Sequence, residues 1–290
     1  MSLLALDAAV VAEAYREACR FDVIAFKPGN VSCEEAGHGM EARDFLRSAA
    51  VSAPWLSKPG LKVGARIAAA IAATREAVGC NTNLGIVLLA APLAQAALVP
   101  APGTDLRTRL RARLAALDLE DAVGAFAGIR LAAPAGLGAA PEADVHAPPT
   151  VDLGTAMALA AGRDRIAQQY GDGYAEVFEL GLPTLHAALA GADGLSEAVQ
   201  AVYLALLRSR PDSHLARKYG DVIAEGVRAQ AAAVACPGKA CENPAAFSGA
   251  LHALDRELKA RGYNPGTCAD LTVASVFAHL LLQALQQRET

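Results

Sequence analysis

The sequence predicts an all-α fold, a single domain of about twelve helices around a buried core rich in alanine and leucine. Two observations lead to this prediction. Hydrophobic residues recur with helical periodicity along most of the chain, and no segment shows a convincing two-residue strand period. The 290 residues are 53% hydrophobic but only 5% aromatic, and the abundant alanine and leucine are the strongest helix formers.

Glycine and proline mark the ends of the predicted helices. We expect helices at 5–26, 41–55, 61–77, 83–98, 105–116, 119–130, 152–169, 172–190, 194–209, 213–235, 244–261 and 268–287. The one long stretch without helix signals is 131–150, and a loop of that length inside a compact domain is often functional. Composition does not change across it, so we treat residues 1–290 as one domain with a long loop at 131–150.

The sequence gives no sign of a secretion signal or of a membrane-spanning helix. The N-terminal stretch lacks a basic region and carries Asp7, Glu13 and Glu17, unlike a signal peptide. The longest apolar stretch, from Leu84 to Pro100, is short for a bilayer span and predicts a buried core helix. We therefore expect a cytoplasmic protein with no membrane partner.

Charge and cysteine content narrow the class of partner. There are 26 basic and 30 acidic residues, a net charge of −4, which argues against a nucleic-acid partner but leaves phosphorylated small molecules open. The six cysteines are scattered and indicate reduced thiols. Cys236 and Cys241, with His252 beyond them, suggest zinc only weakly, and a plain loop pair is the better interpretation.

Polar residues gather in the turns that precede otherwise apolar helices. In Lys27-Pro28-Gly29-Asn30-Val31-Ser32, followed by His38, the polar groups and backbone amides can hold phosphate oxygens, although a plain turn is the commoner use of such residues. In Gly79-Cys80-Asn81-Thr82-Asn83-Leu84-Gly85, we expect Gly79 to end one helix and one of the three polar residues to cap the next. The remaining two are candidates for ligand binding.

Two further segments carry charge. Asp164 and Gln168 are four apart, which would place them on one helical face, with a solvated face as the favoured alternative. After Pro211-Asp212-Ser213, the residues His214, Arg217, Lys218 and Asp221 share one helical face, where neighbouring cations favour an anionic partner about as well as a plain surface.

The last helix opens with a polar turn. Thr267 and Asp270, in Asn264-Pro265-Gly266-Thr267-Cys268-Ala269-Asp270-Leu271, have the spacing of a capping box. The helix that follows is apolar on most faces, so Asp270 lies at the edge of a core, where a carboxylate can bind a metal or act as a base. No Walker A motif occurs anywhere in the chain.

Taken in order, these segments resemble the triphosphoribosyl-dephospho-CoA synthase family (ATP:dephospho-CoA triphosphoribosyltransferases). The matching residues are Lys27-Pro28-Gly29-Asn30-Val31, His38 with Asp44-Phe45 and Ser48-Ala49, Val78 through Gly85, and Asn264 through Leu271. The resemblance implies an all-α fold and transfer of a triphosphoribosyl group from ATP to the 2′-hydroxyl of 3′-dephospho-CoA, with adenine as leaving group.

Some positions depart from the family pattern. Branches that serve carrier proteins read Asn-Thr-His-Lys-Gly where this chain has Asn81-Thr82-Asn83-Leu84-Gly85, and Gly39 replaces an acidic residue. The segments from Arg163 and from Pro211 resemble instead a branch found in archaea and C1-utilising bacteria. A different acceptor, in the synthesis of a C1-carrier cofactor, is therefore the alternative.

The resemblance and the chemistry together suggest roles for the polar residues. Such a transfer needs Mg²⁺ on the triphosphate, cations for the remaining charge and a base for the hydroxyl proton. We assign phosphate binding to Lys27, Arg217 and Lys218, and substrate positioning to Asn30, Asn81, Thr82, Asn83 and Asn264. Asp164 and Asp270 are the candidates for Mg²⁺ or proton transfer, His38 and His214 for the base or for protonating adenine, and Asp22 is a further candidate acid.

Two other functions use the same residues differently. A helical nucleotide- or CoA-binding protein without turnover would need the same cations and caps. A Mg²⁺-dependent phosphohydrolase would need several carboxylates around two metals, and its candidates are Asp144, Asp152, Asp164 and Asp270. A purely structural scaffold leaves the clustered polar turns unexplained.

Overall fold

The all-α prediction is confirmed by the computed structural model, which describes residues 5–33, 35–101, 103–191, 194–234 and 244–288. Within these ranges there is no strand, only a single bridge between Gly37 and Met40. The elements are α1 (Ala8–Ile24), α2 (Ala42–Leu56), α3 (Val63–Val78), α4 (Leu84–Leu98), α5 (Leu106–Leu114), α6 (Leu119–Ala132), α7 (Leu153–Ala160), α8 (Arg165–Asp172), a π-helix η1 (Glu176–Gly181), α9 (Leu182–Ala190), α10 (Leu195–Ser209), α11 (Ser213–Tyr219), α12 (Asp221–Ala233), α13 (Pro244–Ala260) and α14 (Gly266–Gln287).

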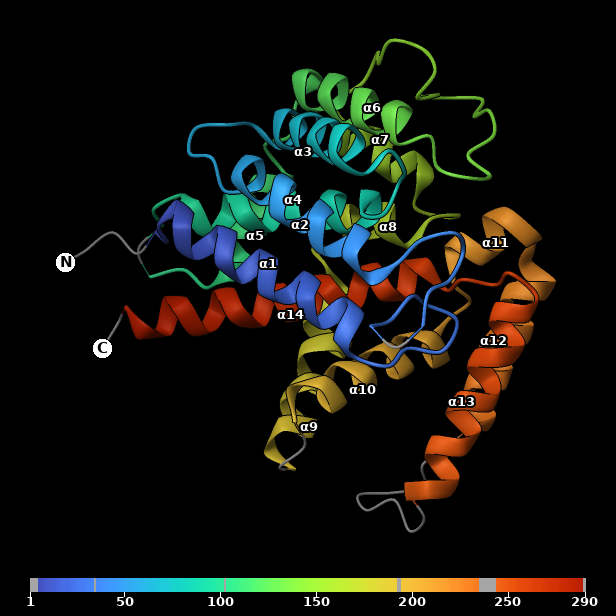
Figure 1. Ribbon diagram of the computed structural model, residues 1–290. Coiled ribbons are helices and arrows are strands. Elements are labelled where there is room, and N and C mark those ends of the chain that lie inside the picture. The colour runs from blue at the N-terminus through green and yellow to red at the C-terminus, as the bar shows by residue number, and fades with distance from the viewer. Residues whose placement is uncertain (1–4, 34, 102, 192–193, 235–243, 289–290) are drawn as a thin grey trace.

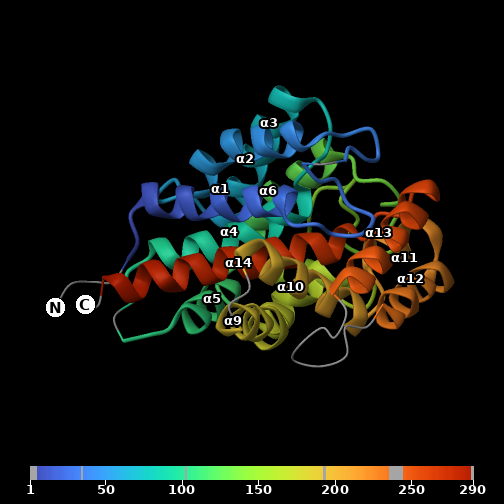
Figure 2. The same ribbon diagram turned by 60° about the horizontal axis from the view of Figure 1, so that its bottom comes forward.

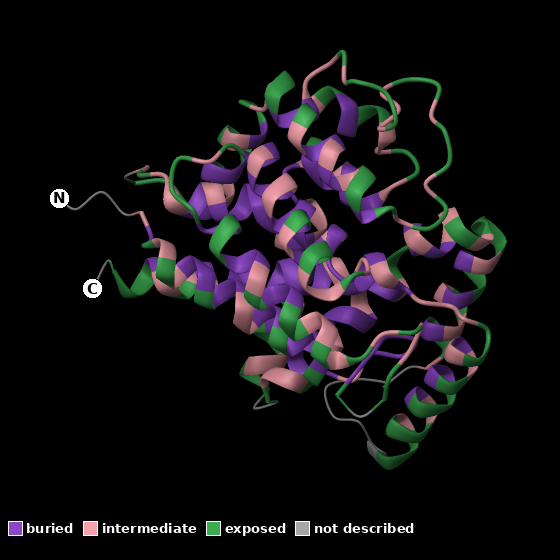
Figure 3. Ribbon diagram, turned by 45° about the horizontal axis from the view of Figure 1, so that its top comes forward, coloured by how far each residue is buried: buried purple, intermediate pink, exposed green. Residues whose placement is uncertain are grey.

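Two apolar helices, α4 and α14, form the centre of the molecule. In α4, 12 of 15 residues are buried, which confirms the core helix expected between Leu84 and Pro100. In α14, 14 of 22 residues are buried, and the helix crosses the middle of the molecule between α1 and α4 on one side and α9 and α10 on the other (Figures 1 and 2). Burial is concentrated there and falls off toward the outer helix faces (Figure 3).

The outer helices cover this centre in layers. Helices α3 and α6 pack on each other above α2 and α4, while α11, α12 and α13 form a separate group at one end of α14 (Figure 1). The two ends of the described chain lie side by side, where the Arg288 side chain binds both the Ala5 carbonyl and the Asp7 carboxylate. The first turn of α14 is therefore at the end of the molecule opposite the chain termini.

Two of the expected helices are each divided in two. The segment predicted as one helix at 152–169 is interrupted at 161–164, because Asp164 begins α8 as its N-cap instead of continuing α7. The segment predicted as one helix at 213–235 breaks at Gly220, whose φ of +90° does not fit a helix. The expected single helix at 172–190 is a π-helical turn that runs into α9.

The length and apolar character of α14 match those of a membrane span, the only such case in the described ranges. However, 72% of the residues in that window are buried inside the protein, as in the central helix of a globular domain. The cysteines considered for zinc, Cys236 and Cys241, lie outside the described residues. His252, the third candidate, stacks on Phe26 with ring centroids 4.4 Å apart.

Candidate active site

All five polar segments singled out in the sequence border one cavity of about 680 Å³, as a shared site requires. This volume is within the roughly 300–1,000 Å³ typical of ligand sites. The cavity lies where α4, α8, α11 and α14 begin, beside the turn that follows α1. Phe126 and Ile129 of α6 and Leu153 and Met157 of α7 give it an apolar side, and residues 134–145 of the long loop form an outer wall.

Asp270 is one of the carboxyl groups on the polar side of the cavity. It lies in the second turn of α14, faces the cavity, and makes no hydrogen bond or ion pair with any described residue. Burial, followed by the charges of Asp22, Asp212 and Asp164, raises the pKa of the Asp270 carboxyl well above its ordinary value. The expected capping box with Thr267 is absent, because α14 begins at Gly266 with Pro265 at the cap position.

Gly85 makes room for this carboxyl group. A Cβ atom on Gly85 would lie 2.5 Å from Asp270 Cγ, closer still to Oδ2, and 2.7 Å from the end of Ile166. The first turns of α4 and α14 approach this closely only because position 85 has no side chain. The glycine shared with the family motif is therefore explained by the carboxyl group opposite it.

Asp164 and Arg217 form the second charged feature of the cavity. Asp164 Oδ1 accepts hydrogen bonds from the amides of Ile166 at 2.8 Å and Ala167 at 3.1 Å, so this residue caps α8. Its Oδ2 binds Arg217 Nη1 at 3.0 Å, and Arg217 Nε reaches the Ala135 carbonyl of the long loop at 3.3 Å. The expected helical pairing of Asp164 with Gln168 is wrong, since Asp164 precedes the helix.

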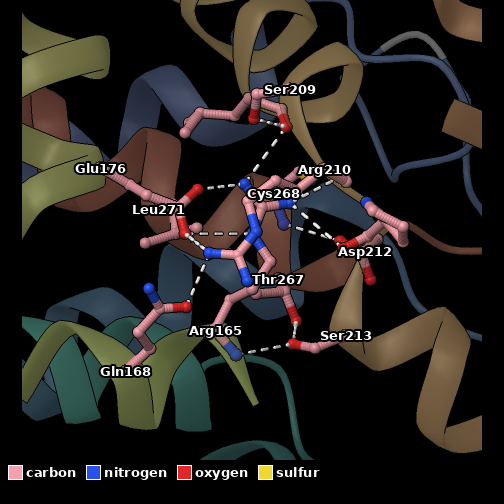
Figure 4. A network of polar contacts seen from close by, with 12 residues as sticks. Arg165, Gln168, Glu176, Ser209, Arg210, Asp212, Ser213, Thr267, Cys268 and Leu271 are labelled. Carbon is pink, nitrogen blue, oxygen red and sulfur yellow. Dashed lines mark hydrogen bonds and ion pairs between the residues drawn. The ribbon is translucent and has the colours of Figure 1, made fainter. Parts of the chain in front are cut away.

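The starts of α11 and α14 are joined by Asp212, a residue that the sequence did not single out for the site. Its Oδ1 accepts from the amides of His214 at 2.9 Å and Leu215 at 3.0 Å, and its Oδ2 accepts from the amide of Cys268 at 2.8 Å. The Ser213 and Thr267 hydroxyls lie 3.0 Å apart within the same group (Figure 4). The cavity walls from α11 and α14 are thus held in one fixed arrangement.

Arg165 ties this group to the π-helix. Its guanidinium pairs with Glu176, and Nη1 approaches the Arg210 carbonyl at 3.2 Å and the Cys268 sulfur at 3.2 Å (Figure 4). The side chain is 4% exposed, so it binds protein groups rather than ligand. The sequence offered no sign of this role, because a buried arginine and a surface arginine have the same neighbours along the chain.

His214 is half-buried and borders the cavity near the first turn of α14. Burial lowers the pKa of its imidazole below the ordinary value, and Arg217, Lys218 and His38 act in the same direction against the opposing charge of Asp212. The ring lies beside Gly266, where a Cβ atom would be 3.4 Å from Nδ1.

Four assigned amide and hydroxyl residues also border the cavity: Asn30, Asn81, Thr82 and Asn264. Asn81 Oδ1 accepts from the Leu84 amide at 3.1 Å, and the Thr82 hydroxyl lies 2.6 Å from that of Ser48. Asn30 Nδ2 donates to the Tyr203 hydroxyl at 2.9 Å. Asn264 Oδ1 is buried without a partner among the described residues.

Four other assigned residues do not border the cavity, and their expected positions are corrected. Lys27 is buried and pairs with Asp22 at 3.1 Å. Asn83 is buried and donates to Thr74 at 3.2 Å, because it turns into the core at the start of α4. His38 Nε2 hydrogen-bonds the Gly29 carbonyl at 2.9 Å, and Lys218 is exposed, with its ammonium 4.9 Å from the Tyr219 ring centroid.

The cation cluster on α11 also differs from the expected helical face. Arg217 is already paired with Asp164, and Asp221 lies beyond the break at Gly220 in α12. Two other arginines, Arg163 and Arg210, border the cavity, although the sequence analysis gave them no role in the site. Arg210 Nη1 donates to Gln168 at 2.6 Å, and both guanidinium groups are at the exposed rim.

The carboxylates do not assemble a resident metal site. In the described ranges, no three His, Cys, Asp or Glu side chains are grouped closely enough to hold an ion. Asp164 is engaged by two amides and an arginine, and Asp152 caps α7 by accepting from the Thr155 amide at 2.8 Å. Asp144 bonds the His146 amide at 2.9 Å within the long loop. This arrangement provides no two-metal centre of the kind a phosphohydrolase needs, whereas the assignment of Asp164 and Asp270 to the Mg²⁺ that accompanies ATP stays a prediction.

Comparison with known proteins agrees with the family suggested by the motifs. A family model described as ATP:dephospho-CoA triphosphoribosyl transferase matches residues 8–289. A crystal structure from Archaeoglobus fulgidus, provisionally assigned as a triphosphoribosyl-dephospho-CoA synthase, covers 82% of this chain and 98% of its own, with a TM-score of 0.64 and 23% identity. At that identity the likeness establishes the fold. No curated protein matches the chain.

Proposed function

The chain belongs to the ATP:dephospho-CoA triphosphoribosyl transferase family, and we propose accordingly that it transfers a triphosphoribosyl group from ATP to a hydroxyl acceptor such as 3′-dephospho-CoA, releasing adenine. The family makes it a transferase. The acceptor and the leaving group are our proposal, and its support comes from the two titratable groups that face the cavity.

The observation that carries the proposal is that the pKa values of Asp270 and His214 are shifted in opposite directions, upward for the carboxyl group and downward for the imidazole. The raised pKa of Asp270 favours the protonated form of its carboxyl group, and the lowered pKa of His214 favours the neutral form of its imidazole. One group can therefore donate a proton and the other can accept one. Pairs of groups whose environments drive them apart in this way are typical of acid–base catalysis.

In the proposed step, the bond between the ribose C1′ and adenine N9 breaks, and its electron pair leaves with adenine. Asp270 donates a proton to a ring nitrogen of the departing base. The acceptor hydroxyl oxygen bonds to C1′ and gives its proton to His214. Water then returns the protons to their starting places, so no oxidant, reductant or further reactant is required.

Arginines at the cavity rim support binding of the triphosphate. Arg163, Arg210 and Arg217 all border the cavity, and arginine presents a fork of donors that matches phosphate oxygens. Mg²⁺ enters this proposal as the counter-ion of ATP, since it is usually bound through phosphates with one or two carboxylates and several waters. The apolar side formed by α6 and α7 suits the adenine ring or an apolar part of the acceptor.

The test is a product assay with Mg-ATP and 3′-dephospho-CoA, in which adenine, ADP and CoA adducts are separated by chromatography. We expect adenine to appear only with acceptor, together with an adduct that keeps three phosphates. Asp270→Asn should reduce the rate of adenine release by about 10²–10⁴-fold, the usual contribution of a positioned acid. Asp105→Asn, at the cap of α5 away from the cavity, is the matched control and should retain the rate.

Other products separate the alternatives. ADP without adenine would refute the transfer. If 3′-dephospho-CoA gives no product but a pool of host metabolites does, the acceptor is different, as the departures around Asn83 and Leu84 suggest. Tight binding of Mg-ATP with no product from either source would instead identify a nucleotide-binding protein without turnover.

A further inference from the structure

Lys27 and Asp22 form a buried ion pair beside the cavity, at the end of α1. Lys27 Nζ lies 3.1 Å from Asp22 Oδ1, and the two side chains are only 1% and 8% exposed. The same ammonium donates to the backbone carbonyl of Asp22. Pro28 and Gly29 turn the chain back toward α1, and the Gly29 amide is fixed by Asp255 at 2.7 Å. The lysine is thus directed into the protein and does not border the cavity.

A carboxylate at this position is doubly unfavourable without its partner. Asp22 belongs to the last turn of α1, where the helix dipole disfavours negative charge, and it is removed from water. Burying both members of an ion pair contributes little to stability, and apolar residues of similar size often serve a fold as well. The pair is therefore poorly explained as a device for stability alone.

The position of Asp22 relative to the cavity gives a second observation. Asp22 borders the cavity, and its buried Oδ1 has no hydrogen-bond partner among the described residues, with Lys27 Nζ 3.1 Å away as its ion-pair partner. Asp270 borders the same polar end and likewise makes no hydrogen bond with the described residues. Among the charged groups that act on Asp270, Asp22 has the largest effect, ahead of Asp212 and Asp164, with Arg217 opposing them. Cys19 of α1 lies in the same surroundings.

We propose that Asp22, in its ion pair with Lys27, is a second catalytic carboxylate and that it faces the positive charge that develops on the ribose ring as adenine leaves. Lys27 is then a positioning residue that acts through Asp22 rather than on phosphate. The inference rests on the proposed transfer of a ribosyl group. It adds to that function the group that stabilises the sugar cation.

The chemistry pairs a neutral carboxyl with a charged one across a single sugar. As the bond from C1′ to N9 breaks, electron density moves to adenine and the ring oxygen and C1′ share a positive charge. Asp270 supplies the proton for adenine, and Asp22 keeps its own charge throughout and forms no bond. Enzymes that cleave glycosidic bonds through such a cation commonly use two carboxyl groups with different protonation states.

Binding of a charged ribose mimic tests this without relying on turnover. The probe is a phosphorylated hydroxypyrrolidine, whose ring ammonium imitates the sugar cation, and the reference is the uncharged cyclopentane with the same substituents. We expect the wild-type protein to prefer the charged mimic by roughly 10²-fold, in the range of a preorganised charge interaction. Asp22→Asn should reduce that preference to about threefold or less, while Asp105→Asn should keep it.

Lys27 is tested through a double-mutant cycle on the same preference. Lys27→Met leaves Asp22 buried without its partner and should lower the preference nearly as far as Asp22→Asn. The double variant Asp22→Asn/Lys27→Met leaves no unpaired charge, so it should fold, and its preference should match that of Asp22→Asn alone. Lys27→Arg keeps a positive charge beside Asp22 and should therefore retain most of the wild-type preference, unlike Lys27→Met.

The outcomes distinguish this inference from the proposed function. Wild-type protein that binds both mimics equally overturns the role of Asp22, even if adenine is released in the product assay. An additional loss of preference when Lys27→Met is placed on Asp22→Asn overturns the role of Lys27. Conversely, a strong preference that depends on Asp22, in a protein that never releases adenine, retains the cation site and refutes the transfer.

Discussion

At the scale of single residues, function depends on carboxyl groups whose surroundings differ over a short distance. Asp270 has no partner and a raised pKa, Asp164 is committed to a helix cap and to Arg217, and Asp22 is paired with a buried lysine. In the proposed mechanism, the same side-chain chemistry therefore supplies an acid at Asp270, a cap at Asp164 and a fixed negative charge at Asp22. In the sequence these three residues are all simply aspartates, and only their neighbours in the folded structure distinguish them.

The opposite pKa shifts predict a bell-shaped dependence of kcat/KM on pH. The acid form of Asp270 is present below its raised pKa and is lost as pH rises through it. The neutral form of His214 is present above its lowered pKa and is lost as pH falls through it. Outside the plateau the rate should change about tenfold per pH unit. His214→Gln should remove the acidic limb only, and a profile that keeps both limbs would contradict the assignment.

Gly85→Ala should damage the site through packing. Its new methyl group would collide with the Asp270 carboxyl group and with the end of the Ile166 side chain, so at least one of them must shift. We expect at least a 100-fold loss of activity and a loss of about 1–3 kcal/mol in the free energy of unfolding, a usual cost of overpacking. Gly226→Ala in α12 meets no atom within 4 Å and should stabilise by about 0.5–1 kcal/mol. Denaturant titration of both variants checks the contrast.

Neighbouring cations on α11 should differ sharply in their effect on nucleotide binding. Arg217 borders the cavity, whereas Lys218 is exposed and outside it. Arg217→Glu should weaken Mg-ATP binding by about tenfold or more, the effect of losing a charge-assisted contact and adding repulsion. Lys218→Glu should change the affinity by less than about threefold, as expected of a solvated charge. Calorimetric titration measures both, and equal effects would show that the whole helix face is used.

At the scale of helices, the breaks that sequence periodicity did not detect are where the site forms. Apolar residues continue across 161–164 and across Gly220, so the pattern predicted uninterrupted helices. The break at 161–164 creates a new helix start at Asp164, and the break at Gly220 creates one at Asp221. Both aspartates border the cavity. The signals were present as Gly162 before Asp164 and as Gly220 itself, but their effect depends on contacts with α14.

Removal of the Asp212 carboxylate should loosen two helices together. Asp212→Ala leaves the amides of His214, Leu215 and Cys268 without their acceptor in a buried setting. We expect the free energy of unfolding to fall by about 2–4 kcal/mol, more than a single lost cap would cost. Asp152→Ala, which removes the exposed cap of α7, should cost about 1 kcal/mol. A similar loss in both variants would mean that Asp212 is no more than a cap.

At the scale of the whole molecule, the sequence was sufficient for the fold class, the core helices and the segments that meet at the site. Those features follow from periodicity and from glycine and proline turns, which are local. The burial of a single residue does not follow from its neighbours along the chain. Lys27 and Asn83 were assigned to ligand binding because the sequence around a polar turn residue does not reveal whether its side chain faces a cavity or the core. Arg165 was missed for the same reason, since its partners come from three distant segments.

Because one cavity joins the starts of four helices, ligand should protect them together. At saturating Mg-ATP we expect slower amide hydrogen exchange in the first turns of α4, α8, α11 and α14, by up to about 100-fold at 100 times Kd if exchange requires release of the ligand. Helices α5 and α9 do not border the cavity and should exchange unchanged. Mass spectrometry of peptides from each helix follows this, and protection of only one segment would argue against a shared site.

The placement of α14 has a consequence for how such a protein diverges. Its body is part of the core and its second turn carries Asp270, so we expect substitutions in this helix to alter both folding and the proposed chemistry. The wall at 134–145 is different, because it is largely exposed and is linked to the rest by few side chains, among them Arg130 to the Val145 carbonyl and Arg217 to Ala135. Mutational drift is therefore tolerated in the wall and resisted in the helix. Under the proposed function, we therefore expect new acceptors to arise by change in the wall, with the groups proposed to break the glycosidic bond retained.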